Sequence, residues 1–482
     1  MQNNSKLEKI FLNNKDKILI QNIDNSFLTY ENFWKKSLFL KSYLITSGLK
    51  NGDIVLVKSN NCLEYLNILI SCAMGGFVFC PIDNQLKDKQ ISFYKKILNP
   101  KIYLDDLSIL PSIENNDLIE DENIKINYDN NYLIMMTSGT SGEPKGMMFT
   151  LNNIIKSSSF FAKLVGYDFQ SKIYHILPMH YMAGLINTFF SPLTAGSTII
   201  LGQQFSSTSL LDFWNNPVKY NANSLHLTPS IASFLADLSR DNLIVKNHTQ
   251  NYREIISTGS YLFPNITKKF EEKFNFRLLS CYGITEAGGP LTLQNWEDTF
   301  IINNVGSHSP EVEFKSTKIN SHDQQNTLFV KTPFMMKGYL NDLPHSLKCS
   351  LDLDFEGFFN TQDFADYENG KIIIKGRRKD IIKKSGELIS LAHIENSALK
   401  IEHIKEVACI GIDDEIVGSK IIMFLVFNNS LDCFDKVAEI KNELKKSLKR
   451  IEIPDKFMPV PELPKTESGK ILKRVLIDSY IN

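Results

Sequence analysis

Residues 132–146 read YLIMMTSGTSGEPKG, and the rest of the chain is interpreted outward from them. The apolar run 132–136 is typical of a buried strand, and a loop of small residues follows it directly. Glycines let such a loop turn so that successive backbone N–H groups converge on an anion. The loop is not a Walker loop, because no Gly-Lys-Ser/Thr follows the glycines, and a flexible Ser/Gly linker is the alternative. Its hydroxyls and lysine suit polyphosphate oxygens. The candidate residues are Thr137, Ser138, Gly139, Thr140, Ser141, Gly142 and Lys145.

Length, charge and cysteine content are those of an ordinary globular protein. The 482 residues fit one large and one small domain or three domains, and a formal net charge of −1 indicates neither nucleic acid nor an anionic membrane as partner. The 7 cysteines are scattered without a Cys-x-x-Cys pair, which favours reduced thiols in a cytoplasm. No apolar signal core follows the N-terminus, and the longest apolar run, 66–82, is interrupted by polar residues. We expect a soluble, cytoplasmic protein without an integral membrane segment.

Strand and helix patterns alternate over most of the chain. Residues 54–57, 61–74 and 77–79 predict a strand, a helix and a strand, a βαβ unit that implies a parallel sheet. After Gly306 the pattern changes to short β pieces. The same alternation predicts strands at 173–177, 197–201, 224–227, 253–257 and 277–280, and helices at 185–193, near 210, from 228 and at 265–274.

These patterns predict an α/β fold in two parts. We expect a large N-terminal domain, 1–378, with mostly parallel sheets flanked by helices and a β-barrel-like part near its end. A small, mobile α+β domain, 379–482, would follow as a lid, with a helix at 392–399 and strands at 407–412 and 421–427.

A second informative stretch, 279–288, reads LSCYGITEAG. Here a predicted strand ends in an aromatic residue, a glycine and a Thr-Glu pair. An aromatic side chain at the carboxyl end of a strand can stack on a nucleobase, and a glutamate beside phosphates can hold Mg²⁺. The alternative is a turn with an ordinary surface glutamate. The candidates are Tyr282, Gly283, Thr285 and Glu286.

Three further stretches are informative. Residues 357–363 read GFFNTQD, and Asp363 is a candidate to accept both ribose hydroxyls at the rim of a cleft; an exposed turn aspartate is the alternative. Residues 376–386 read GRRKDIIKKSG. Such a basic run is by itself typical of a solvated or anion-facing patch. Near the end of the chain, 463–470 reads LPKTESGK, with Lys470 on a glycine turn.

In this order, the five motifs resemble those of the adenylate-forming superfamily, which includes acyl-CoA synthetases, luciferases and the adenylation domains of peptide synthetases. The resemblance spans residues from Thr137 to Lys470. Segment 282–286 is similar to the Tyr-Gly-x-Thr-Glu motif residue for residue, whereas the family usually has glycine where Gln362 stands. Many acyl-CoA ligases also have glycine where Glu387 stands, which leaves the thiol acceptor open.

The resemblance implies a role for each motif. The loop would bind the β- and γ-phosphates of ATP, with Glu286 and Thr137 as metal ligands. Tyr282 would lie against adenine and Thr285 near the α-phosphate. Arg377 and Asp363 would hold the ribose. The hinge would be Lys379, Gly386 would line a pantetheine tunnel, and Lys470 would bridge the substrate carboxylate and the α-phosphate, offsetting their repulsion.

Two weaker segments concern the acid. Residues 177–184 read LPMHYMAG and resemble the family's Pro-x-x-His segment, which implies His180 as a gate of the acyl pocket; a core or surface histidine is the alternative. The peptide synthetase adenylation domains of this family typically place an aspartate here to pair with the substrate's α-ammonium. No aspartate lies between 177 and 193, so the resemblance argues against an amino acid as the substrate. Residues 257–261 resemble the strand end that contacts adenine, which implies Gly259 and Ser260 as further binding residues.

The implied activity is that of an AMP-forming acid–thiol ligase. ATP and Mg²⁺ would activate a carboxylic acid to an acyl-adenylate with release of pyrophosphate, and a thiol would then take the acyl group. Coenzyme A is the first expectation for that thiol, and phosphopantetheine on an acyl carrier protein is the alternative. A non-catalytic nucleotide-binding homologue is the alternative from another class. A phosphotransferase is a weaker alternative, because the sequence has neither a Walker lysine nor a kinase-type base.

Overall fold

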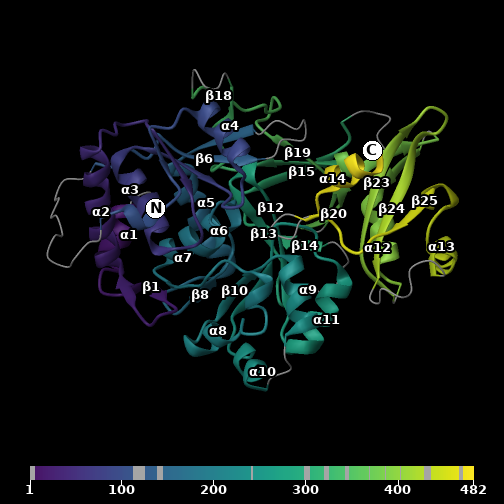
Figure 1. Ribbon diagram of the computed structural model, residues 1–482, viewed down its shortest axis with the longest axis horizontal. Coiled ribbons are helices and arrows are strands. Elements are labelled where there is room, and N and C mark those ends of the chain that lie inside the picture. Colours follow the sequence, from purple (N-terminus) through teal and green to yellow (C-terminus); the bar gives the residue numbers. More distant parts are fainter. Residues whose placement is uncertain are drawn as a thin grey trace.

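The computed structural model describes residues 6–111, 125–137, 145–239, 243–297, 304–319, 325–341, 347–368, 370–385, 387–401, 403–427, 436–465 and 471–481. Two β-sheets and their helices form a body, and the C-terminal elements form a smaller group beside it (Figure 1). We call residues 379–482 the lid and the preceding residues the body.

The larger sheet of the body holds thirteen strands in the described part of the chain. Its order is β15-β16-β19-β20-β14-β13-β12-β11-β10-β8-β9-β1-β2, and the run from β12 to β1 is parallel. Its strands are β1 (Ile18–Asn22), β2 (Phe27–Thr29), β8 (Lys172–His175), β9 (Thr198–Leu201), β10 (Ser224–Leu227), β11 (Glu254–Ser257), β12 (Leu278–Ile284), β13 (Gly289–Leu293), β14 (Asn304–Ser307), β15 (Glu313–Thr317), β16 (Thr327–Lys331), β19 (Phe359–Glu368) and β20 (Lys371–Arg377).

The smaller sheet contains the βαβ unit expected from residues 54–79. Its order is β18-β17-β7-β6-β4-β3-β5, with β5, β3, β4 and β6 parallel and β7 returning antiparallel to β6. Its strands are β3 (Ile54–Lys58), β4 (Val78–Ile82), β5 (Ile102–Leu104), β6 (Asn131–Thr137), β7 (Lys145–Thr150), β17 (Gly338–Leu340) and β18 (Cys349–Ser350).

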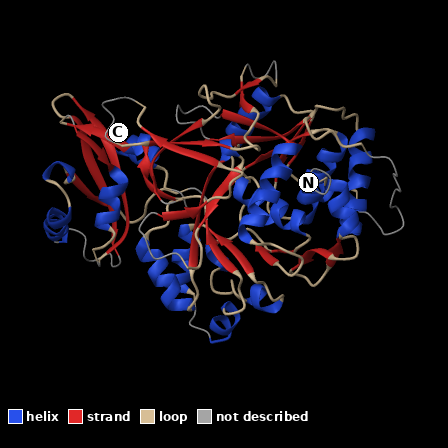
Figure 2. Cartoon of the chain, turned by 180° about the vertical axis from the view of Figure 1, so that it is seen from behind, coloured by secondary structure: helices blue, strands red, loops and turns tan. Residues whose placement is uncertain are grey.

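Helices cover and connect the two sheets (Figure 2). One core cluster joins residues of both sheets, for example Ile20 and Phe79, through helical side chains such as Phe189. The helices of the body are α1 (Leu7–Asn13), α2 (Tyr30–Thr46), α3 (Leu63–Gly75), α4 (Asp88–Leu98), α5 (Leu151–Val165), α6 (Met182–Leu185), α7 (Ser191–Ala195), α8 (Asn215–Lys219), α9 (Pro229–Leu238), α10 (Leu243–Thr249) and α11 (Pro264–Phe274). Each tryptophan packs on a phenylalanine: Trp34 on Phe11, Trp214 on Phe274 and Trp296 on Phe276.

Local sequence explains several helix starts. The helix expected from 228 begins at Pro229, whose missing N–H costs nothing in a first turn, and Thr228 Oγ1 accepts a hydrogen bond from the Ile231 N–H at 3.3 Å. The helix expected at 185–193 is instead α6, a π-helical turn Ile186–Phe190, and α7. Periodicity alone does not predict such a turn, because it adds a single residue to the helical repeat.

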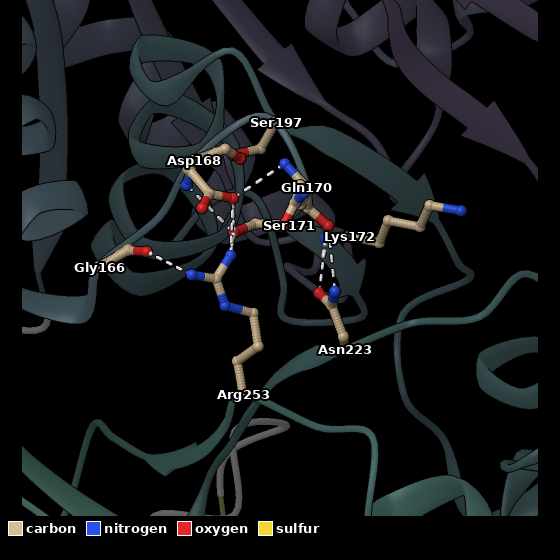
Figure 3. Close-up of polar contacts among 8 residues, drawn as sticks. All are labelled: Gly166, Asp168, Gln170, Ser171, Lys172, Ser197, Asn223 and Arg253. Carbon is tan, nitrogen blue, oxygen red and sulfur yellow. Dashed lines mark hydrogen bonds and ion pairs between the residues drawn. The ribbon is translucent and has the colours of Figure 1, made fainter.

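A polar cluster ties together the amino ends of β8, β10 and β11, at the edge of the sheet opposite the strand ends described below (Figure 3). Arg253 Nη1 donates to Asp168 Oδ1 at 2.6 Å and to Ser171 Oγ at 2.9 Å. Asn223 accepts from the Lys172 N–H at 2.7 Å and donates to Gln170 O at 3.0 Å. The cluster thereby holds the three strands in register.

The prediction of a β-barrel-like part after Gly306 is wrong. Strands β14, β20, β19, β16 and β15 continue the larger sheet as an antiparallel extension, and the described residues form no closed barrel. Among the described strands β15 is an edge strand that pairs with β16 alone, so the extension stays open. Short strands separated by glycine and polar turns are common to barrels and open sheets, so the sequence did not distinguish them.

The lid is an α+β unit, as the sequence predicts. A three-stranded sheet carries helices, and a two-stranded hairpin precedes it in the described part of the chain. The elements are β21 (Ile381–Lys384), β22 (Glu387–Ser390), β23 (Ile404–Asp414), β24 (Gly418–Phe427), β25 (Lys456–Pro459), α12 (Leu391–Ala398), α13 (Lys436–Ser447) and α14 (Lys473–Ile481). Lys465 Nζ of the lid lies 5.8 Å from the ring centroid of Phe234 in the body.

Candidate nucleotide-binding site

The carboxyl ends of β10, β11 and β12 bring several candidate residues to one edge of the larger sheet. In open α/β sheets, ligands bind outside these ends. Residues 258–260 follow β11, and Gly259 has φ +88°, a conformation that favours glycine. Gly259 and Ser260 are both exposed, so this turn is open to a ligand.

The phosphate-loop candidates span the turn between β6 and β7. Thr137 pairs with Lys145 at the ends of these antiparallel strands, so the two ends of the loop lie side by side. Ser138, Gly139, Thr140, Ser141 and Gly142 lie outside the described residues. The ammonium of Lys145 lies 5.5 Å from the ring centroid of Tyr339. The loop therefore joins two strands of a hairpin, which the sequence pattern did not predict.

Tyr282, Asp363 and Arg377 meet although they come from three separate motifs. Tyr282 Oη donates to Asp363 Oδ2 at 2.6 Å, and Arg377 Nε lies 2.9 Å from Asp363 Oδ1. Asp363 is only 1% exposed, so the interpretation as an exposed turn aspartate is wrong. Burial raises the pKa of Asp363, while Arg377 and Tyr282 act to lower it. Burial, reinforced by the Asp363 charge, raises the pKa of Tyr282 well above its usual value, so its hydroxyl stays protonated.

A tight turn after β12 places Glu286. Just before the turn, within β12, a Cβ on Gly283 would clash with Gly289 O of β13, so only glycine fits there. The 3₁₀ turn Thr285–Ala287 follows, and Glu286 O accepts from the Met336 N–H at 2.9 Å. Tyr339 Oη donates to Glu286 Oε1 at 2.7 Å. Sequence reasoning missed Tyr339, because no pattern links it to a glutamate 53 residues earlier.

His180 and its neighbour Tyr181 differ in accessibility. His180 is 9% exposed, and its Nε2 lies 3.7 Å from Asp83 Oδ2, too far for a hydrogen bond. Burial lowers the pKa of His180, which Asp83 partly offsets. Tyr181 is half-buried and occupies the third position after Pro178, and its ring centroid lies 4.3 Å from that of His180, with the rings tilted by 43°. The structure therefore places the tyrosine at the more accessible of the two positions.

The hinge candidate lies where the body meets the lid. Lys379 is the middle residue of the 3₁₀ turn Arg378–Asp380, directly after β20 and Arg377. Gly386 and Lys470 lie outside the described residues. An isolated bridge between Lys465 and Ile471 brings together the two ends of the segment that contains Lys470.

An ion-pair cluster connects the hinge turn to the end of the chain. Lys473 Nζ lies 2.9 Å from Glu395 Oε1 and 3.3 Å from Asp380 Oδ1. The same Glu395 oxygen accepts from the Cys409 N–H at 2.6 Å. Burial alone would lower the pKa of Lys473, but the two carboxylates raise it overall. The cluster ties α14 and α12 to the hinge turn.

Fold and site together define an α/β protein with a candidate nucleotide-binding site at strand ends and a smaller C-terminal α+β part. Residues 7–340 match the family described as AMP-binding enzyme, and residues 393–470 match the AMP-binding enzyme C-terminal domain. The chain belongs to the AMP-binding enzyme family.

Curated relatives match along nearly the whole chain. The long-chain-fatty-acid–CoA ligase FadD13 of Mycobacterium tuberculosis is 24% identical over 91% of this chain and 90% of that protein. The 2-succinylbenzoate–CoA ligase of Staphylococcus epidermidis is 26% identical over 94% of each chain. The oxalate–CoA ligase of Arabidopsis thaliana is 23% identical over 90% of each. All three are CoA ligases.

Solved structures share the fold. The ATP-bound MatB structure from Rhodopseudomonas palustris has a TM-score of 0.84 and 21% identity, and covers 99% of both chains. The o-succinylbenzoate CoA synthetase MenE from Bacillus subtilis, in complex with its acyl-adenylate intermediate OSB-AMP, has a TM-score of 0.82 and 22% identity over 98% of this chain and 97% of that one. No helix within the described residues is long and apolar enough to span a membrane.

Proposed function

We propose that this protein is an AMP-forming acyl-CoA ligase. It activates a carboxylic acid with ATP to an acyl-adenylate, releases pyrophosphate and transfers the acyl group to coenzyme A. The observation that carries the proposal is the buried Asp363, held by Tyr282 and Arg377, because it joins three separate motifs into one nucleoside site. Family membership and CoA-ligase relatives over at least 90% of the chain support the same reaction.

In the first half-reaction, the acid carboxylate attacks the α-phosphorus of ATP and pyrophosphate leaves. Asp363 and Arg377 hold the ribose, Tyr282 packs against the adenine, and Thr285 lies near the α-phosphate. The loop from Thr137 to Lys145 holds the β- and γ-phosphates. The roles of Ser138, Gly139, Thr140, Ser141 and Gly142 follow from this assignment. Lys470 offsets the negative charge that builds up where the two anions meet.

The residues present fit a magnesium ion next to the phosphates. Glu286 would supply a carboxylate, the hard oxygen ligand that Mg²⁺ prefers, and Thr137 would supply a hydroxyl. Tyr339 occupies one Glu286 oxygen, and within the described chain the other accepts no hydrogen bond. Because Mg²⁺ is usually held by one or two carboxylates and substrate phosphates, one such group is sufficient. When bound, the ion would neutralise part of the phosphate charge.

The second half-reaction requires a different face of the lid. The proposed domains are 1–378 and 379–482, and rotation about Lys379 withdraws Lys470 and presents the segment around Gly386 to the thiol. A lid that alternates its faces lets one cleft perform two reactions while it excludes water from the adenylate. The relatives use fatty, 2-succinylbenzoic and oxalic acids, so they favour no single acid class for this chain.

Pyrophosphate release tests the proposal. Wild-type protein is incubated with ATP, Mg²⁺ and short, medium, long or aromatic carboxylic acids, with and without coenzyme A. We expect release that depends on one acid class and that coenzyme A stimulates. Lys470→Ala is the matched variant and should lose adenylation while it retains thioester formation from supplied acyl-adenylate.

Other outcomes would contradict parts of the proposal. Acid-dependent release that coenzyme A does not stimulate would favour a carrier-protein thiol. Release of ADP would indicate a kinase. No pyrophosphate release with any acid of a wide panel, together with intact ATP binding, would indicate a non-catalytic binding protein. Equal loss of both half-reactions in Lys470→Ala would refute the role of that lysine.

A further inference from the structure

Tyr339 connects two charged groups that the proposed function assigns to phosphate and metal binding. Its hydroxyl donates to Glu286 Oε1 at 2.7 Å, and its ring centroid lies 5.5 Å from the ammonium of Lys145. The residue belongs to the smaller sheet, where Tyr339 pairs with Met147 across β17 and β7. Glu286 follows β12 of the larger sheet. One side chain therefore spans the junction of the two sheets at the site.

The segment around Tyr339 fixes the Glu286 turn from the main chain as well. Glu286 O accepts from the Met336 N–H at 2.9 Å, and the Lys337 N–H donates to Met148 O of β7 at 2.7 Å. Thr332 Oγ1 donates to Ala287 O at 3.3 Å. The backbone of the turn is thus already held, so the Tyr339 hydroxyl is left to set the direction of the Glu286 carboxylate.

We propose that Tyr339 is a positioning residue for the metal-binding carboxylate of Glu286. By donating to one oxygen, it leaves the second oxygen for the cation and opposes rotation of the carboxylate when the cation binds. Partners that orient a metal ligand commonly contribute ten- to a hundredfold to metal affinity. This inference rests on the proposed function, because it takes Glu286 as the magnesium ligand.

Tyr339→Phe isolates the hydroxyl. The variant keeps the ring over Lys145 and the packing of β17 on β7, and removes only the hydrogen bond to Glu286. Tyr128→Phe is the matched control, because Tyr128 also donates its hydroxyl to a glutamate, Glu8, near the start of the chain. Both changes delete one tyrosine–glutamate hydrogen bond, but only one of them lies at the proposed site.

The primary readout is calorimetric ATP affinity with saturating Mg²⁺ and with EDTA. In wild-type protein, we expect Mg²⁺ to strengthen ATP binding. In Tyr339→Phe, this strengthening should fall about tenfold, while the affinity in EDTA stays unchanged. The Mg²⁺ concentration for half-maximal pyrophosphate release should rise about tenfold as well. Tyr128→Phe should match wild type in every measurement.

Glu286→Gln completes a double-mutant cycle. Because Tyr339 acts through Glu286, adding Tyr339→Phe to Glu286→Gln should produce no further loss of the Mg²⁺ effect. Additive losses would overturn the inference, and so would an equal fall of ATP affinity with and without Mg²⁺, which indicates direct contact with the nucleotide or a structural defect. If wild-type ATP binding does not respond to Mg²⁺ at all, the metal assignment of the proposed function fails instead.

Discussion

At the scale of single residues, Asp363 is a buried carboxylate that we propose as a ribose ligand. It is 1% exposed, and a guanidinium and a phenol hold it. Asp363→Asn keeps the shape of the side chain but removes its charge, and with it the partner of Arg377. Hydrogen bonds to charged groups contribute about 1.5–3 kcal/mol, so ATP affinity should fall about ten- to a hundredfold in calorimetry.

Asp366→Asn is the control for that substitution. Asp366 lies on the same strand but is partly exposed and pairs with Lys375 at 3.1 Å. Exposed pairs contribute little, so its ATP affinity should equal that of wild type. Unchanged affinity in Asp363→Asn would place the ribose elsewhere.

The burial of Glu254 should make the free energy of unfolding depend on pH. The residue is 4% exposed, and within the described chain its Oε1 has no hydrogen-bond partner. Burial raises its pKa from 4.5 to about 7. The folded state therefore binds a proton that the unfolded state releases between these values, so this group lowers stability as pH rises from about 4.5 to 7. At 1.36 kcal/mol per pKa unit, the loss is on the order of 3 kcal/mol.

Glu254→Gln should remove this loss. Burial also lowers the pKa of His175 to about 4 and of His226 to about 3, and their effect on stability has the opposite sign. Because both histidines remain in the variant, the difference between the two proteins isolates Glu254. Urea unfolding at pH 5 and pH 8 should show the variant gaining relative to wild type as pH rises. Parallel profiles would contradict the assignment, and exposed Glu272→Gln serves as control.

At this scale, the sequence predicted which residues belong to the candidate site better than it predicted their burial and contacts. Tyr282 and Asp363 were candidates from their motifs, and the structure joins them over 81 positions of sequence. Burial of Asp363 was not predictable, because it depends on side chains supplied by other strands. Tyr339 was not predicted for the same reason, since its hydrogen bond to Glu286 depends on a contact between two sheets.

At the scale of elements, the turn before Asp363 contains a residue in an uncommon conformation. Gln362 has φ +61°, in the left-handed region, at a position where the family usually has glycine. The left-handed conformation costs a non-glycine residue about 1–2 kcal/mol, whereas the extra chain entropy of glycine costs about 0.5–1 kcal/mol. Gln362→Gly should therefore raise the free energy of unfolding by up to about 1.5 kcal/mol in urea titrations.

Gln85→Gly provides the comparison for that change. Gln85 is an exposed turn residue outside the left-handed region, so glycine there brings only the entropic cost. A loss of stability in both variants would show that Gln362 is not strained.

Elements were predictable where a local pattern determines them. The βαβ unit at 54–79 and the proline-initiated helix after Thr228 match the sequence expectation. The π-helical turn at Ile186–Phe190 and the hairpin of β6 and β7 were not predicted. Both depend on packing between segments, and the open extension of the larger sheet depends on strand pairing across the whole body.

At the scale of the whole molecule, the Lys473 cluster predicts a defect confined to the lid. Lys473→Met leaves the buried Glu395 without its cation and should destabilise the lid by about 3 kcal/mol. Protease cleavage within the lid should accelerate, while a fragment of the body persists. Adding Glu395→Gln should restore most of the resistance, because it removes the unpaired charge but keeps an acceptor for the Cys409 N–H.

Lys446→Met tests whether loss of any lid ion pair suffices. Lys446 is exposed and pairs with Glu443, so its loss should not change the cleavage rate. Simultaneous loss of the body fragment in Lys473→Met would show that the two parts unfold together. A persistent fragment that ends near residue 378 would support the proposed domain boundary.

The placement of the tryptophans gives the protein an optical property. Trp34, Trp214 and Trp296 all belong to the body, and the lid sequence contains a single tyrosine, Tyr480, and no tryptophan. Indole emission therefore follows melting of the body alone, whereas far-ultraviolet circular dichroism records the backbone of both parts. In a heated sample, a dichroism change that precedes the fluorescence change would be the spectroscopic signature of the lid.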